Sequence, residues 1–107
     1  MSSRVKTSNR GRRQRTLEEN LKRLKPILNR KFKVKRLGIF GSYVRGQARR
    51  YSDVDVLVEF SGRVDLLDFV AMERYLRDQT GAKIDLVSIK ALRPEFRGTI
   101  LNEVVYI

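Results

Sequence analysis

The sequence contains no cysteine and no histidine, and these two absences narrow the chemistry that the chain can perform. Without cysteine there is no disulfide framework, no thiolate metal site and no thiol nucleophile. Without histidine, imidazole-based catalysis and histidine-rich metal sites are excluded as well. Any reaction must therefore use carboxylates, hydroxyls, lysine, arginine or backbone groups.

Long apolar runs are missing too. No window of the sequence approaches the ~20 apolar residues that a membrane-spanning helix needs. The basic N-terminus also lacks the apolar segment of a secretory signal. We therefore expect a cytoplasmic protein without membrane contact. With 107 residues, the chain should form one small domain with a thin hydrophobic core.

Acidic residues are scarce in the first third of the chain. Residues 1–36 contain 14 Lys and Arg against two acids, whereas residues 37–107 contain ten of each, so the net charge of +12 lies before Leu37. Residues 1–15 have too few apolar side chains to offset their ordering entropy, which predicts a disordered basic arm. Three interpretations of this arm stay open: a solubilising tail, a contact with nucleic acid or an acidic partner, or the remnant of a tag.

Cap and turn signals divide residues 16–107 into helices and strands. Thr16 and Glu19 form a capping-box pattern, and leucines at helical spacing predict a helix to about Asn29, which Pro26 should kink or shorten. The later elements are predicted at 33–40 (strand), 43–50 (short helix), 53–60 (strand), 65–80 (helix with Leu66, Phe69, Met72 and Leu76 inward and Gly81 as its C-terminal cap), 83–88 (strand), from Pro94 (helix) and 104–107 (strand). This order predicts an α/β (α+β) domain in which helices pack on one small mixed sheet.

Two aspartates interrupt the most apolar strand. Asp53 and Asp55 share one face of residues 53–60, while the valines between and after them face the other way. At ~3.3 Å per residue their Cα atoms are roughly 6–7 Å apart, close enough for each carboxylate to raise the pKa of the other. A divalent cation would remove this penalty, and two Mg²⁺ ions ~3.5–4 Å apart suit such a clamp. Taken alone, the pair is weak evidence, because most such pairs are strand ends or turn caps.

Gly41 and Ser42 stand between a predicted strand and a predicted short helix. Backbone N–H groups at such a junction can receive an anion, and the Ser42 hydroxyl adds a donor. By themselves the two residues indicate only a turn. Together with Asp53 and Asp55 they predict a phosphate-binding turn beside a metal clamp, which is the minimum apparatus for transfer at the phosphorus of a nucleotide.

The spacing of these residues carries a family resemblance. Gly41-Ser42, ten residues and then Asp53-x-Asp55 resembles the G-S-x10-D-x-D motif of the DNA polymerase β-like nucleotidyltransferases. The fuller pattern, which adds Arg45, Gly46, Ala48, Arg49, Ser52 and Val58, resembles the minimal nucleotidyltransferase (MNT) branch, known as antitoxins paired with HEPN-domain toxins. The match is dense over residues 38–60 and continues more loosely to the C-terminus, with only residues 1–15 outside it.

The resemblance implies a metal site with a third acid. Asp85 is the candidate, because it interrupts the apolar run of a later strand; on the sequence alone it could equally be a strand-edge residue held by Lys83 or an arginine. The family pattern implies that Asp53 and Asp55 bridge two Mg²⁺ ions. It also implies that Asp85 holds the catalytic metal and helps to deprotonate the attacking hydroxyl.

The nucleotide-binding residues follow from the same resemblance. Gly41 and Ser42 would hold the triphosphate of ATP. Arg45 has two interpretations: it neutralises phosphate or the acidic cluster, or it forms a structural salt bridge to Asp53, Asp55 or Glu59.

The resemblance implies a Mg²⁺-dependent protein adenylyltransferase. It would transfer AMP from ATP to a tyrosine hydroxyl of a cognate HEPN ribonuclease toxin and so act as its antitoxin. About 90 ordered residues leave no room for an acceptor-binding domain, so the partner must supply that surface. Two alternatives stay open: an antitoxin or adaptor that binds the toxin without catalysis, and a nucleic-acid-binding module that acts through residues 1–15.

Overall fold

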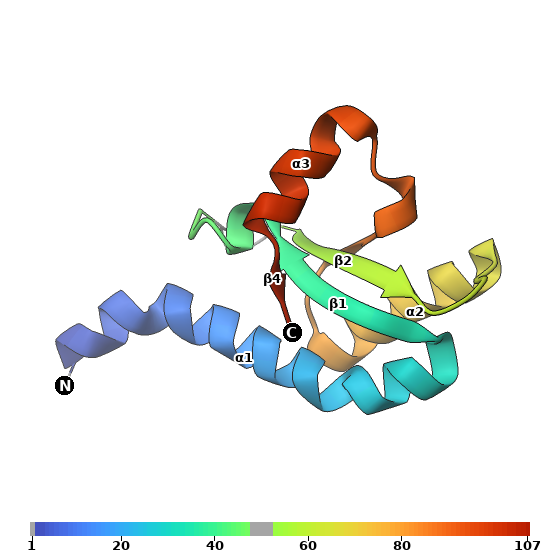
Figure 1. Ribbon diagram of the computed structural model, residues 1–107. Helices are drawn as coiled ribbons and strands as arrows, with labels where there is room; N and C mark the ends of the chain where they lie inside the picture. The colour runs from blue at the N-terminus through green and yellow to red at the C-terminus, as the bar shows by residue number, and fades with distance from the viewer. Residues whose placement is uncertain (1, 48–52) are drawn as a thin grey trace.

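The fold follows the predicted alternation of helices and strands. The computed structural model describes residues 2–47 and 53–107, with side chains described from residue 16 onward. The elements in chain order are α1 (Ser2–Phe32), β1 (Val34–Phe40), the 3-10 helix η1 (Gly41–Tyr43), β2 (Val54–Phe60), α2 (Leu66–Thr80), β3 (Ile84–Ser88), the 3-10 helix η2 (Ile89–Ala91), α3 (Pro94–Glu103) and β4 (Val105–Tyr106) (Figure 1).

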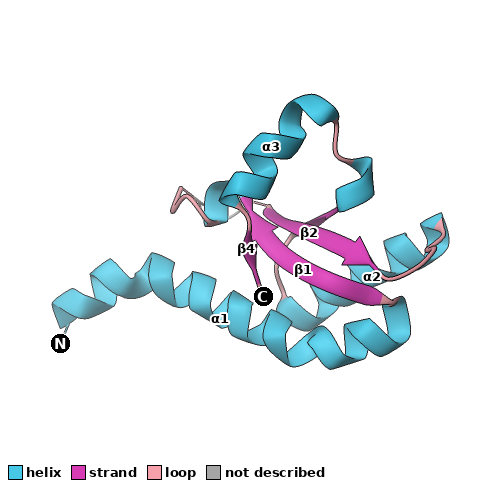
Figure 2. Cartoon of the chain, viewed as in Figure 1, coloured by secondary structure: helices cyan, strands magenta, loops and turns pink. Residues whose placement is uncertain are grey.

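The strands form one mixed sheet in the order β3-β2-β1-β4. The β1 strand pairs antiparallel with both β2 and β4, whereas β2 and β3 run parallel. Parallel neighbours cannot be joined by a tight hairpin, and here α2 provides the crossover between them (Figure 2). The predicted mixed sheet packed with helices is confirmed.

Hydrophobic cores lie on both faces of the sheet. The larger core joins the sheet to α1 and α2, and Val54, Val56 and Val58 are fully buried in it. The smaller core holds Phe40, Leu57 and Ile89 under residues of α3. Each fully buried aliphatic side chain contributes roughly 1.5–3 kcal/mol relative to an exposed one. Because Val54, Val56 and Val58 are buried on one face of β2, the residues between them face the α3 side.

The α2 helix shows how local signals set an element. The Asp65 carboxylate accepts the N–H of Asp68 at 2.8 Å, and Gly81 ends the helix in the left-handed region with φ of 70°. Both predicted caps are confirmed. Met72 is fully buried, but Leu66 is 75% exposed. The inward prediction for Leu66 is wrong because the first turn of α2 projects past the end of β2 (Figure 1).

The α1 helix begins earlier than predicted. It runs from Ser2, so Thr16 lies inside the helix and is not its N-cap. Residues 2–15, which we predicted as a disordered arm, continue the same helix. They contain no proline and several good helix formers, so nothing in them stops the helix. The first of the described side chains to be buried is Leu17, and the preceding part of α1 extends beyond the sheet (Figure 1). The division of the chain at residue 16 into arm and domain stays a prediction.

Two further predictions, the effect of Pro26 and the short helix at 43–50, can be compared with the structure. Pro26 does not end α1, which continues to Phe32. The short helix predicted at 43–50 is replaced by η1 and a turn that ends near Gly46, while residues 48–50 lie outside the described residues. Across the part of the chain that the structure describes, no helix has both the length and the apolar character to cross a membrane.

Candidate active site

The parallel pairing of β2 and β3 places two of the predicted acids side by side. Asp55 is the register partner of Asp85, and both lie on the sheet face opposite the buried Val54 and Ile84. Asp53 immediately precedes β2 and is exposed. The structure therefore brings Asp85 to the acidic pair, as the family resemblance implies.

The acids interact electrostatically at this end of the sheet. The pKa of Asp55 is raised above its ordinary value, mainly by partial burial and then by the negative charges of Asp85 and Asp53. The positive charge of Arg45 opposes this shift, while Glu103 adds to it. Ionised Asp55 is thus held in an environment that disfavours its charge. For Asp55, this agrees with the expected effect of neighbouring carboxylates.

The donor chemistry suits a hard divalent cation. Carboxylate oxygens are the protein ligands that Mg²⁺ prefers, and a cation would relieve the repulsion at Asp55. Within residues 2–47 and 53–107, however, no three acidic side chains are already close enough to form a metal cluster. The three carboxylates are the type of ligand that Mg²⁺ prefers, and binding would have to draw Asp53 and Asp85 closer to Asp55.

Gly41 lies directly against the acids. Its φ of 80° is in the left-handed region, and a Cβ atom added there would collide with Oδ2 of Asp55. Phe40, the preceding residue, is the antiparallel register partner of Asp55. Only glycine meets both the conformational and the steric requirement. The turn and the acidic strand are therefore in direct contact, whereas phosphate binding by Gly41 and Ser42 stays a prediction.

Arg45 has a partner that the sequence did not predict. Its Nη1 donates to Oε1 of Glu103 at 2.8 Å, and its Nε donates to Gln47 at 3.1 Å. The salt bridge to Asp53, Asp55 or Glu59, which was one of the two interpretations of Arg45, is not formed in the described residues. Glu59 pairs instead with Arg36 at 2.7 Å. The other arginine of the family pattern, Arg49, lies outside the described residues.

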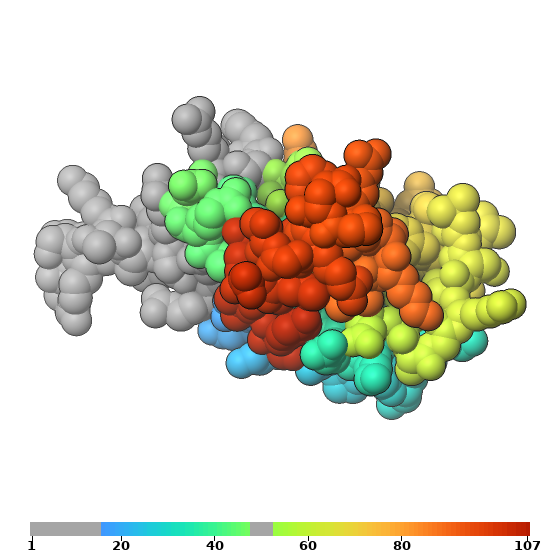
Figure 3. Space-filling model, turned by 45° about the horizontal axis from the view of Figure 1, so that its top comes forward, coloured from blue at the N-terminus to red at the C-terminus, as the bar shows by residue number. Residues whose placement is uncertain are grey.

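Glu103 is the residue that sequence reasoning missed. Its Oε2 accepts the backbone N–H of Gly41 at 2.7 Å, so the C-terminal end of α3 lies against the Gly41 turn. Figure 3 shows the green surface of the turn beside the red C-terminal segment. One signal was available: an acid in the last turn of a helix opposes the helix dipole, so its carboxylate needs donors from elsewhere.

Comparison with known proteins decides the family. Residues 21–107 match the model of the nucleotidyltransferase domain. The chain belongs to the nucleotidyltransferase domain family. Protein adenylyltransferase MntA of Thermococcus cleftensis is 43% identical over 91 residues, which cover 85% of this chain and 92% of that protein. This confirms the resemblance to minimal nucleotidyltransferases, and by homology the chain is a nucleotidyltransferase of the MntA-like type.

Solved structures of lower identity share the fold of this nucleotidyltransferase. A toxin–antitoxin structure with AMP-PNP superposes with a TM-score of 0.70 at 21% identity, covering 83% of this chain and 70% of that chain. A complex of the tri-AMPylated HEPN toxin of Shewanella oneidensis with its MNT antitoxin gives a TM-score of 0.63 at 16% identity, covering 84% and 70%. At these identities the two likenesses concern the fold alone, and they support the nucleotidyltransferase architecture assigned above.

Proposed function

We propose that this nucleotidyltransferase transfers AMP from ATP to a tyrosine hydroxyl of a cognate HEPN ribonuclease toxin, and that this modification silences the toxin. The observation that carries the proposal is the pairing of Asp55 with Asp85 beside Gly41. That arrangement puts two carboxylates and a glycine turn at one end of one sheet, which supports the proposal. The 43% identity to a protein adenylyltransferase supports a protein as the acceptor.

Each residue has a role in the proposed transfer. Asp53 and Asp55 would hold two Mg²⁺ ions with Asp85, and the ions, when bound, would neutralise charge on the phosphates. Gly41 and Ser42 would hold the triphosphate through a backbone N–H and a hydroxyl. The tyrosine oxygen bonds to the α-phosphorus, the bond from that phosphorus to the pyrophosphate oxygen breaks, and pyrophosphate leaves. Asp85 helps to draw the proton from the attacking hydroxyl.

The domain itself offers little to hold an acceptor. The described residues form one sheet with its helices, and the first part of α1 extends beyond it, so no separate acceptor-binding domain is available in them. Specificity for the acceptor must then come from a surface that the partner brings. A folded toxin with an exposed tyrosine meets that requirement.

Transfer can be tested with a HEPN ribonuclease whose gene neighbours the gene of this protein. We expect label from α-³²P-ATP to appear on the ribonuclease in the presence of Mg²⁺, pyrophosphate to be released, and ribonuclease activity to fall. Replacement of the modified tyrosine by phenylalanine in the ribonuclease should remove the label. Tight binding and inhibition without label would instead support the non-catalytic antitoxin, and labelling of RNA ends would support the nucleic-acid alternative.

A further inference from the structure

The Glu103 carboxylate already occupies an anion-binding position. Its Oε2 accepts the N–H of Gly41 at 2.7 Å and its Oε1 accepts Nη1 of Arg45 at 2.8 Å. A carboxylate bound through both oxygens presents the same two acceptors and the same sign of charge as one edge of a phosphate group. The Gly41 N–H, which the proposed function assigns to the triphosphate, is therefore engaged by a side chain of the protein itself, together with Arg45, for which contact with phosphate is one of two interpretations.

The backbone around Glu103 keeps this carboxylate in place. A Cβ atom added at Gly38 would lie 2.6 Å from Cγ2 of Val104 and 3.2 Å from the carbonyl oxygen of Val105. Gly38 thus lets the C-terminal segment approach β1 closely, and β4 pairs with β1 there through Tyr106. The segment that carries Glu103 is fixed against the sheet, so its contact with the turn is not a chance conformation of a free end.

The α3 helix does not favour this charge. Glu103 is its last residue, where the partial negative charge of the helix dipole repels a carboxylate. Glu103 also adds to the raised pKa of Asp55, so it places a further negative charge near the acidic clamp. Its favourable contacts come from Gly41 and Arg45, which are also the donors that an incoming triphosphate would use.

We propose that Glu103 is an internal competitor of the nucleotide: its carboxylate holds the Gly41 N–H and Arg45 until the triphosphate of ATP displaces it. The proposal rests on the proposed function for the identity of the ligand, but not for the contact itself. Displacement would release the Glu103 side chain from the turn and leave Arg45 to face phosphate, while the backbone of the segment stays paired with β1. Binding then includes a cost that a neutral side chain at position 103 would remove.

Glu103→Gln tests the competition, because the amide keeps the shape and an acceptor for Gly41 but loses the charge. We expect the variant to bind Mg²⁺–ATP about tenfold more tightly than the wild type, measured by calorimetry, which corresponds to about 1.4 kcal/mol. Inorganic tripolyphosphate should show the same gain, and adenosine should show none because it carries no phosphate. Glu95→Gln is the matched control: Glu95 is an exposed acid in the first turn of the same helix, and its removal should leave all three affinities unchanged.

The outcomes separate this inference from the proposed function. Unchanged or weaker Mg²⁺–ATP binding by Glu103→Gln, with an active wild type, would overturn the competition and leave the proposed function standing. Tighter tripolyphosphate binding by the variant, with no Mg²⁺–ATP binding by the wild type, would support the competition and contradict the proposed function. If neither protein binds either ligand, both fail.

A second variant guards against misfolding. Glu103→Asp keeps the charge but shortens the side chain, so it cannot span both donors. It should also bind Mg²⁺–ATP more tightly than the wild type, with a smaller gain than Glu103→Gln. Should Glu103→Gln unfold, equal or weaker Mg²⁺–ATP binding by Glu103→Asp would by itself overturn the competition.

Discussion

Asp55 and Glu59 lie on the same face of β2, but their surroundings shift the pKa values of the two carboxylates in opposite directions. Glu59 has Arg36 as its register partner on β1, and the hydrogen bond from that guanidinium lowers the pKa of Glu59. Asp55 has Phe40 and Asp85 as register partners, and its pKa is raised by burial and by neighbouring acids. One strand therefore carries a compensated acid at one end and an uncompensated acid at the other.

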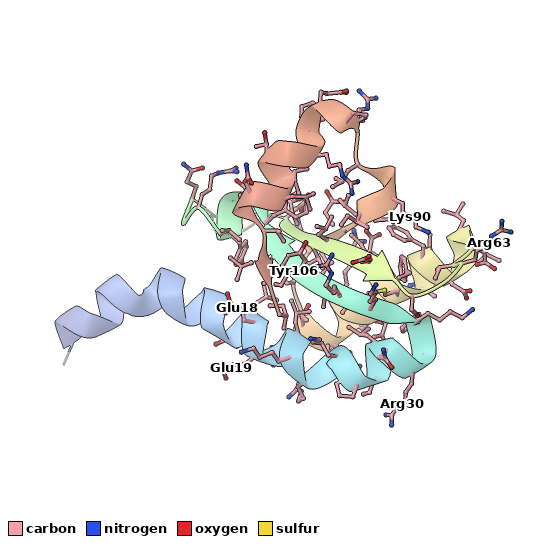
Figure 4. All side chains as sticks on the ribbon, viewed as in Figure 1. Glu18, Glu19, Arg30, Arg63, Lys90 and Tyr106 are labelled. Atoms are coloured by element: carbon pink, nitrogen blue, oxygen red, sulfur yellow. The ribbon has the colours of Figure 1, made fainter. Side chains whose placement is uncertain are left out.

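The surroundings of the two ends extend the contrast. Lys35 and Lys90 also lower the pKa of Glu59, and Figure 4 shows Arg63 and Lys90 at the end of the sheet where β2 finishes. A cleft of ≈ 570 Å³ opens there, and none of the three predicted acids lines it. Positive side chains therefore gather near Glu59, whereas the pKa of Asp55 is raised by burial and by its neighbours, which is consistent with the proposal that the ligand binds at the Asp55 end.

The largest expected effect concerns transfer. Asp55→Asn should lower the rate of AMP transfer by at least ~100-fold, because loss of a proposed metal ligand would remove several kcal/mol of transition-state stabilisation. Glu59→Gln removes the same charge from the other end of the strand and should leave the rate within about twofold. Initial rates of label transfer measure both. Near wild-type transfer by Asp55→Asn would contradict the two-metal site.

Serines near the two ends of β2 provide a second test, in which a smaller effect is expected. Ser42→Ala should weaken Mg²⁺–ATP binding by about tenfold, because a hydrogen bond to a charged group contributes roughly 1.5–3 kcal/mol. Ser61 follows β2 at the other end, where its hydroxyl donates to the carbonyl of Lys33 at 3.2 Å. Ser61→Ala should slightly lower the melting temperature without changing the affinity for Mg²⁺–ATP. Equal losses of stability and affinity in Ser42→Ala would favour a plain turn.

Asp55 and Glu59 should change the stability of the protein with pH in opposite directions. The raised pKa of Asp55 means that the folded state binds its proton more tightly than the unfolded state. The stability from this group is present below the ordinary carboxyl pKa and is lost as pH rises through the raised value. At pH 7 without metal, Asp55→Asn should therefore raise the melting temperature, by a few degrees at most because solvent screens the site. The gain should shrink as pH falls through that window.

Glu59 should behave in the opposite way. Its pKa is lowered, so its contribution is present above the ordinary carboxyl pKa and is lost as pH falls through the lowered value. Glu59→Gln should lower the melting temperature at pH 7, and this loss should disappear in acid. Asp78→Asn, at an exposed acid of α2, controls for the removal of one negative charge from a chain of net charge +12. Melting curves that move in the same direction for Asp55→Asn and Glu59→Gln would contradict the contrast.

The smallest effect on the site is expected from deletion of residues 1–15. The net charge lies before Leu37, and the predicted site residues all lie between Gly41 and Asp85, so nucleotide affinity should be unchanged. Capture of RNA or of an acidic partner should weaken, most clearly at low salt where attraction is least screened. Loss of Mg²⁺–ATP binding on deletion would show that these residues belong to the domain.

The features that the sequence predicted correctly depend on near neighbours or on a dense motif. Asp65 caps α2 and Gly81 ends it through contacts within a few residues. The alternation in β2 is also local, and the family pattern directed attention to Asp85. Each of these can be identified without knowing where distant segments lie.

The features that were missed depend on contacts that no local pattern records. Glu103 reaches Gly41 across most of the chain, so the partner of Arg45 could not be predicted from spacing. The start of α1 was misplaced because Thr16 resembles a cap, although nothing before it prevents a helix. The exposure of Leu66 depends on how far α2 extends past β2, which is a matter of tertiary packing.

The parallel pairing of β2 with β3 has a consequence for the order in which the chain folds. The antiparallel pair of β1 and β2 is complete in sequence before α2 begins, whereas a parallel neighbour needs a crossover, here through the 15-residue α2. During synthesis on the ribosome, Asp53 and Asp55 therefore emerge before Asp85, and Glu103 emerges last. We expect a nascent chain to pass through a stage with a formed hairpin and an incomplete acid set, in which nucleotide transfer cannot begin until the C-terminal third has been released.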